Sequence, residues 1–125
     1  MTFSIDLSRA IEKAKDHQAL AYKKIAIELF GEVIRKSPVD TGRFLGNWQC
    51  GINVMPTTAT ETTDKDGGAT TSAMTKSVMS ARGLPTFWLA NNLPYANKLE
   101  FGYSRQAPTG MVRVSLAEIS ARYGR

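Results

Sequence analysis

Residues 22–38, which read YKKIAIELFGEVIRKSP, decide how the rest of the chain has to fold. Apolar side chains recur in this stretch at spacings of three and four residues, which places them on one face of an α-helix. The members of that face are Tyr22, Ile25, Leu29 and Val33. Charged side chains fill much of the opposite face. The helix has to stop at Pro38, because proline disfavours a helical conformation in the residue before it.

The helical pattern continues backwards to about Ile5, so we expect a first helix of about thirty residues that ends at Lys36. Asp6 or Ser8 is expected to cap its start. Because such a helix is long for a small domain, we expect part of its apolar face to pack on a sheet and part to contact a neighbouring subunit.

Downstream of the helix, residues 44–55 alternate between apolar and polar side chains, and residues 86–92 form a short apolar run. Both patterns predict strands. Residues 73–83 predict a short helix with Met74, Val78 and Met79 facing inward. Residues 95–102 predict a helix of one or two turns or a kinked segment, and residues 108–125 an extended entry followed by a C-terminal helix. The sequence therefore predicts one α+β domain over residues 1–125, in which the two terminal helices pack on a small, mainly antiparallel sheet. So few strands make additional pairing plausible, including pairing between subunits.

Residues 56–75 are rich in threonine and contain almost no large apolar side chain. This composition predicts an exposed, mobile loop, because the segment cannot bury enough apolar surface to offset its ordering entropy. A hairpin with a tight turn at Asp66 and Gly67 is the alternative.

The composition is typical of a soluble protein, with 42% hydrophobic and 22% charged residues. No apolar run is long enough for a membrane span, and we expect neither membrane contact nor a secretory signal. The net charge of +5 is concentrated in residues 76–125, a distribution that suits nucleic acid or an acidic protein surface. The sequence shows no cluster of lysine and arginine interleaved with aromatic residues, so it does not predict sequence-specific DNA recognition.

Asp40, Thr41 and Gly42 spell the tripeptide that carries the catalytic carboxylate of aspartic proteases. Those enzymes place the aspartate at the end of a buried apolar strand, whereas here a charged helix and a proline precede it. A turn requires less: Gly42 with a positive φ, and either the Asp40 carboxylate or Thr41 accepting hydrogen bonds from nearby N–H groups. We interpret the tripeptide as a turn.

The other reactive side chains do not form a site in the sequence. His17 lies in a charged helical stretch without a partner. Cys50, the single cysteine, sits at an inward strand position and cannot form an internal disulfide. Asp64 and Asp66 are too few to form a calcium loop. We expect no catalytic residue, no metal site and no cofactor.

Two separated segments form a pair of motifs. The first is residues 38–44, PVDTGRF, which follow the first helix, and the second is residues 92–102, NLPYANKLEFG, which precede the last helix. The motif residues are Pro38, Val39, Asp40, Thr41, Gly42, Arg43 and Phe44 in the first segment, and Asn92, Pro94, Tyr95, Ala96, Glu100, Phe101 and Gly102 in the second. In this order and at this spacing the pair resembles the neck or tail-completion proteins of tailed bacteriophages. Trp48 and Gln49 depart from the smaller polar residues that the resemblance leads us to expect at those positions.

The resemblance implies a structural virion protein of the head–tail connector that assembles as a homo-oligomeric ring. Its implied partners are other copies of itself and phage head-closure, tail-terminator or tail-tube proteins, with possible contact to genome DNA. It would be assembled in the cytoplasm of a bacterial host. The first segment would serve as a structural turn. The second would contact a neighbouring subunit or partner, with Glu100 either pairing with a basic group of that neighbour or lying on the surface. The alternatives are a basic DNA-contacting protein and an Asp-Thr-Gly protease.

Overall fold

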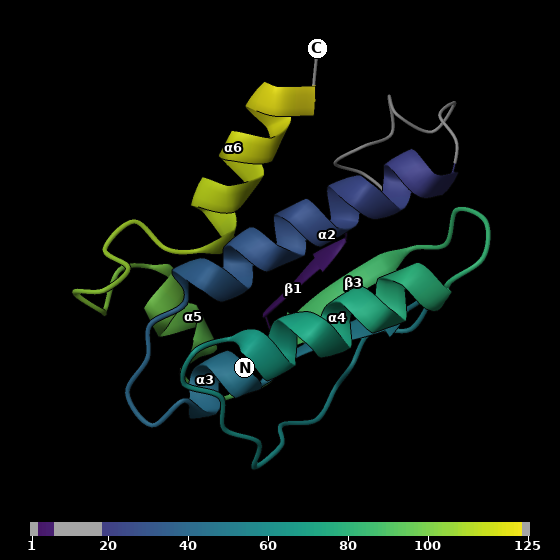
Figure 1. Ribbon diagram of the computed structural model, residues 1–125. Coiled ribbons are helices and arrows are strands. Elements are labelled where there is room, and N and C mark those ends of the chain that lie inside the picture. The colour runs from purple at the N-terminus through teal and green to yellow at the C-terminus, as the bar shows by residue number, and fades with distance from the viewer. Residues whose placement is uncertain (1–2, 7–18, 124–125) are drawn as a thin grey trace.

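The computed structural model of the protein describes residues 3–6 and 19–123, and Figure 1 shows the arrangement. In these ranges three strands form one sheet: β1 (Phe3–Asp6), β2 (Trp48–Ile52) and β3 (Phe87–Asn91). The order is β1-β3-β2, and β3 pairs antiparallel with both neighbours. The predicted small antiparallel sheet is confirmed. Its additional strand comes from the beginning of the same chain, which sequence reasoning had not identified.

The described helices are α2 (Ala19–Lys36), α3 (Arg43–Gly46), α4 (Gly68–Ser80), α5 (Ala96–Glu100) and α6 (Val112–Tyr123). Figure 1 shows α2 and α4 side by side in front of the sheet, with α6 against α2 on the side away from α4. The α+β class predicted from the sequence is therefore confirmed.

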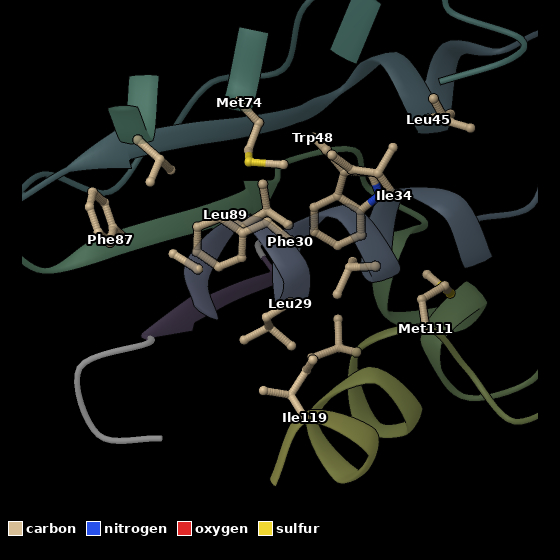
Figure 2. Close-up of a cluster of buried hydrophobic side chains, with 14 of the residues drawn as sticks. Leu29, Phe30, Ile34, Leu45, Trp48, Met74, Phe87, Leu89, Met111 and Ile119 are labelled. Carbon is tan, nitrogen blue, oxygen red and sulfur yellow. The ribbon is translucent and has the colours of Figure 1, made fainter. Parts of the chain in front are cut away.

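The apolar face predicted for α2 is buried over its whole length, because the sheet and the other helices surround it. Its buried residues are Tyr22, Ile25, Ala26, Leu29, Phe30, Val33 and Ile34. The rings of Tyr22 and Phe87 stack with centroids 5.1 Å apart, which fixes α2 against β3. Side chains from α2, α4, α6 and the sheet meet in this single core (Figure 2).

The C-terminal end of α2 is closed by a buried hydrogen-bond chain. The indole Nε1 of Trp48 donates to Oγ of Ser37 at 2.8 Å, and this hydroxyl donates to the carbonyl of Val33 at 2.8 Å. The bulky Trp48, which departs from the expected family pattern, therefore fills the core and at the same time satisfies a helix terminus.

Helix α6 of the same chain packs against one side of α2. Val112 and Ile119 of α6 are buried, and Glu28 accepts hydrogen bonds from both Arg122 and Tyr123. Lys36 pairs with Glu118 at 3.0 Å. In the described part of α2, Leu20 is the large apolar side chain that stays exposed, so α2 has no apolar stripe left for a partner.

The beginning of the chain differs from the prediction. Ile5 and Asp6 belong to β1, where they pair with Leu89 and Trp88, so the first helix does not begin there and Asp6 is not its cap. The alternative cap, Ser8, lies outside the described residues.

The second strand is shorter than its alternating pattern. Phe44 belongs to α3, and β2 ends at Ile52 because Asn53 adopts φ 63°. Val54, which shares the inward parity, is consequently 74% exposed. The alternating pattern therefore extends beyond β2 at both ends and overestimates the length of the strand.

The predicted helix of residues 73–83 starts earlier, at Gly68, and ends at Ser80. Met74 and Val78 face the core as predicted, but Met79 is 48% exposed, since only one side of α4 contacts the rest of the fold. Helix α4 thus takes up the end of the threonine-rich stretch, so residues 56–75 are not all loop.

Candidate functional site

The first signature segment, residues 38–44, forms the predicted turn. Gly42 adopts φ 89°, and the Thr41 hydroxyl accepts a hydrogen bond from the N–H of Arg43 at 3.2 Å. The short helix α3 then begins at Arg43. The expectation that the Asp40 carboxylate accepts bonds here is wrong, since Thr41 has that role and Asp40 is exposed. An exposed carboxylate in a turn differs from the buried carboxylate at a strand end that an aspartic protease requires.

The second signature segment, residues 92–102, leaves β3 and forms α5. Ala96 is buried, whereas Tyr95 is 38% and Phe101 59% exposed. Asn92 donates to the carbonyl of Pro56 at 3.1 Å, and Gly102 closes α5 at φ 93°. Pro94 is exposed as well, so the segment presents proline and aromatic side chains at the surface.

Glu100 was predicted to contact a neighbouring subunit or to lie on the surface, and both expectations are wrong. Its side chain is 1% exposed and holds the N-terminus of α6. Oε1 accepts the N–H groups of Met111 and Val112 at 2.8 and 2.9 Å, and Oε2 accepts the N–H and Nε of Arg113, each at 3.0 Å. A carboxylate is the favoured partner for free N–H groups at the positive end of a helix, so Glu100 attaches α6 to α5.

The two signature segments meet in space. The side-chain amide of Gln106 pairs with the backbone of Val39, accepting its N–H at 2.8 Å and donating to its carbonyl at 2.9 Å. The rings of Phe44 and Tyr95 lie 6.2 Å apart. Between the segments is an open groove of about 450 Å³, lined among others by Pro38, Asp40, Tyr95, Tyr103 and Arg105.

A group of exposed aromatic and basic side chains lies next to this groove, and we call it the basic-aromatic surface. Its members are Lys98, Phe101, Tyr103, Arg105 and Arg113. Tyr103 is 76% exposed, and the guanidinium of Arg113 lies 4.7 Å from the ring centre of Phe101. Between Asp66 and Glu118 the sequence contains one acidic residue, the buried Glu100.

The basic-aromatic surface combines bases that are spread out along the sequence. In the sequence KLEFGYSR, residues 98–105, the glutamate separates the bases and suggests a mixed, neutral surface. Since Glu100 points into the protein, the face that remains outside carries Lys98, Phe101, Tyr103 and Arg105 without an acidic neighbour from the same segment.

Residues 53–67, which we call the threonine segment, are irregular but closely held. Asn47 is buried, and its side chain accepts the N–H of Thr60 at 2.8 Å and donates to the Thr60 carbonyl at 3.1 Å. Gln49 donates to the carbonyl of Thr58 at 2.7 Å. The segment is a mostly exposed loop as far as Gly67, as expected from the sequence, and it forms no hairpin.

Gly42 of the first turn and Gly46 of α3 allow this close approach. The N–H of Asp64 donates to the carbonyl of Gly42 at 2.9 Å, and a Cβ on Gly42 would lie 2.9 Å from the Asp64 backbone. A Cβ on Gly46 would lie 2.8 Å from the carbonyl oxygen of Thr62. Gly42 is therefore required both for its positive φ and for the contact with the threonine segment.

Asp64 connects the threonine segment to α4. Its carboxylate is buried and accepts the N–H groups of Gly67 and Thr70 at 3.0 and 2.8 Å. Burial alone would raise the pKa of Asp64, but the hydrogen bonds from Thr70 and Gly67 outweigh it and lower this pKa to about 2. Asp64 thus has a structural role as the cap of α4, and Asp66 accepts the N–H of Gly68 at 2.9 Å.

Cys50 and His17 are the remaining reactive side chains that the sequence singles out. Cys50 is half-buried, and burial raises the pKa of its thiol to about 11, so it is a poor nucleophile at neutral pH. His17 lies outside the described residues. Within residues 3–6 and 19–123, no group of histidine, cysteine, aspartate and glutamate is arranged to hold a metal ion.

Among the helices that the structure describes, none combines the length and the apolar character needed to cross a membrane. Comparison of the chain with protein-family models, with curated protein sequences and with solved structures yields no match.

Proposed function

We propose that the chain is a structural virion protein of the head–tail connector of a tailed bacteriophage, a neck or tail-completion protein. It assembles as a homo-oligomeric ring and contacts head-closure, tail-terminator or tail-tube proteins. It acts through the shape and chemistry of its surfaces rather than by catalysis, and it needs no cofactor. Assembly takes place in the bacterial cytoplasm, and the final location is the virion.

One observation carries this proposal: the two segments that resemble the phage proteins build a single surface. They are separated by about fifty residues, yet Val39 of the first pairs with Gln106 just beyond the second, and Phe44 contacts Tyr95. The groove between them and the adjoining aromatic side chains are exposed. A surface rich in tyrosine and arginine has the composition of a protein contact.

The role of Asp40 is consistent with a structural protein. Asp40 is exposed in the turn, and the strongest constraint on its tripeptide is at Gly42, which contacts the threonine segment. The tripeptide is thus explained by backbone geometry, without assigning chemistry to the carboxylate.

The test is to purify the protein and measure its mass by size-exclusion chromatography with light scattering, alone and after incubation with tailless heads or with isolated tails. The proposal predicts self-association or incorporation into a particle, and mass spectrometry of mature virions should detect the chain. A monomer that joins neither heads nor tails, or virions that lack the chain, would contradict it.

DNA contact is the second candidate function, and the basic-aromatic surface favours it. Binding of this kind would weaken steeply with salt, because phosphate contacts release counterions. Fluorescence anisotropy with a labelled duplex at 50 and 200 mM salt measures it. Affinity that is absent at both salt concentrations removes this candidate and leaves the structural role untouched.

A further inference from the structure

The basic-aromatic surface has the properties of one half of a protein contact. Tyr103 and Phe101 are 76% and 59% exposed, which is unusual for large aromatic side chains with no role in the core. Tyrosine and arginine are enriched at the centres of protein interfaces, where they contribute most of the binding energy. Because the exposed charges from Lys98 to Arg113 are all positive, the matching surface has to be negative or polar.

The threonine segment has the complementary charge. The segment contains three acidic residues against a single base, Lys65. Asp66 is exposed, and Glu61 is 92% exposed although its Oε1 pairs with Arg43 of the same chain at 3.2 Å. Its other exposed side chains are mostly threonines, whose methyl and hydroxyl groups suit contact with tyrosine. Irregular segments longer than about 12–15 residues are uncommon in compact domains unless they have a function.

The threonine segment is also preformed. Side-chain amides of Asn47, Gln49 and Asn92 hold its backbone carbonyls, so its shape exists before any partner binds. A surface that is already ordered loses little conformational entropy on association, which favours affinity. Residues 57–59 and 61–63 remain exposed, and Glu61 among them pairs with Arg43.

The two surfaces lie on different parts of the molecule. Figure 1 shows the connection between α5 and α6 at the left, beside α2, whereas the threonine segment passes below α3 and α4. A copy cannot bring its own two surfaces together, but it can offer each of them to a different neighbour. The apolar face of α2 is not available for either contact, because it is buried in the core.

We propose that the basic-aromatic surface of one copy binds the threonine segment of a second copy, so that Tyr103 and Arg105 of the first contact the surface around Glu61 of the second. Such a contact joins two dissimilar faces, and each added copy leaves one face of each kind open, so association continues until a ring closes. This inference rests on the proposed self-assembly and names the two faces that perform it.

The test uses two variants of the full chain that each remove one face. Tyr103→Ala/Arg105→Ala removes the basic-aromatic surface, and Glu61→Lys reverses the charge of the threonine segment. All three side chains are exposed, so both variants should melt like the wild type. Arg82→Ala and Glu118→Lys repeat the charge changes at exposed positions elsewhere and serve as matched controls.

Sedimentation velocity over a range of protein concentrations then distinguishes the outcomes. Wild type and both controls should form species larger than a dimer, whereas each face variant alone should associate at least tenfold more weakly. An equimolar mixture of the two face variants should form a 1:1 heterodimer and nothing larger, because it contains one intact face of each kind.

Several results would overturn the inference. If both face variants assemble like the wild type, self-assembly stands but uses other surfaces. If the mixture stays monomeric, or if the control variants associate as weakly as the face variants, the two faces are not specific partners. If the wild type is monomeric and Tyr103→Ala/Arg105→Ala instead loses affinity for a labelled oligothymidine or DNA duplex, the surface binds nucleic acid and the inference is wrong.

Discussion

Replacing Glu100 with glutamine tests whether this carboxylate holds α6 in place. Glutamine keeps the size of the side chain but has one acceptor oxygen, so its NH₂ group would face the two donors of Arg113 that now bind Oε2. The Arg113 guanidinium is 53% exposed and can turn to water. The part-buried backbone N–H of Arg113 cannot turn to water in this way and loses its acceptor.

The expected cost follows from these two losses. An unsatisfied buried N–H costs about 1–3 kcal/mol, and removing a negative charge from a helix N-terminus costs up to about 2 kcal/mol. We therefore expect Glu100→Gln to lower the free energy of unfolding by about 3 kcal/mol. For a chain of this size that loss lowers Tm by roughly 10 °C.

Urea unfolding followed by far-UV circular dichroism at pH 7 measures this cost, and Arg113→Gln is the matched control. The control removes the exposed partner but leaves the carboxylate its three backbone N–H groups, so it should cost only about 1 kcal/mol. The reasoning is refuted if Glu100→Gln costs less than about 1 kcal/mol, or if Arg113→Gln costs as much as Glu100→Gln.

Three further predictions concern the threonine segment and the cysteine. Because the folded pKa of Asp64 is about 2, below its ordinary value of 3.8, its carboxylate stabilises the fold at neutral pH by about 2 kcal/mol, and this contribution should disappear as the pH falls from about 5 to 2. Urea titrations at several pH values should show that the free energy of unfolding falls less steeply with decreasing pH in Asp64→Asn than in the wild type. An equal dependence on pH in the two proteins would contradict the capping role. Gly42→Ala should lower the free energy of unfolding by about 2–3 kcal/mol, because Gly42 has a positive φ and its new Cβ would meet the Asp64 backbone. Gly31→Ala, in an open helix position, should raise the free energy of unfolding by about 0.5–1 kcal/mol. Equal shifts of Tm in the two variants would refute this difference. Cys50, with its pKa raised to about 11, should react with a thiol reagent at pH 8 much more slowly in the folded than in the urea-unfolded protein, and comparable rates would show that it is accessible and ionised.

The sequence predicted the elements that depend on local pattern. The apolar face of α2 is confirmed from Tyr22 to Val33, because the spacing of apolar residues in the sequence directly indicates which side of a helix is buried. Strand β3 and helix α6 were found for the same reason, since each is a compact apolar or periodic run ended by turn residues.

Elements that depend on distant contacts were missed. Strand β1 pairs with β3 across more than eighty residues, and its local pattern continued the helical one. Helix α4 begins with glycine and threonine, which are weak helix formers, and it is stabilised by Asp64 and by the burial of Met74 and Val78. The pair Asp64 and Asp66 just before it was an available signal for a capped helix start.

The candidate site shows the same division. The turn at Gly42 could be predicted because the turn chemistry is local. The inward position of Glu100 could not, because a glutamate between Leu99 and Phe101 fits a surface helix equally well. One signal was the beginning of α6, where Gly110 and Met111 offer no side-chain oxygen to cap the helix, so the cap has to come from another part of the chain.

Site-directed crosslinking tests head-to-tail self-association most directly. The double variant Thr62→Cys/Lys98→Cys places one thiol beside each proposed contact and keeps Glu61, Tyr103 and Arg105, while the native Cys50 stays poorly reactive near pH 7. With a short bis-maleimide, denaturing gels should show a ladder of dimers, trimers and larger products for the double variant, and only monomer for either single variant. Dimers from a single variant, or no ladder from the double variant, would contradict the account.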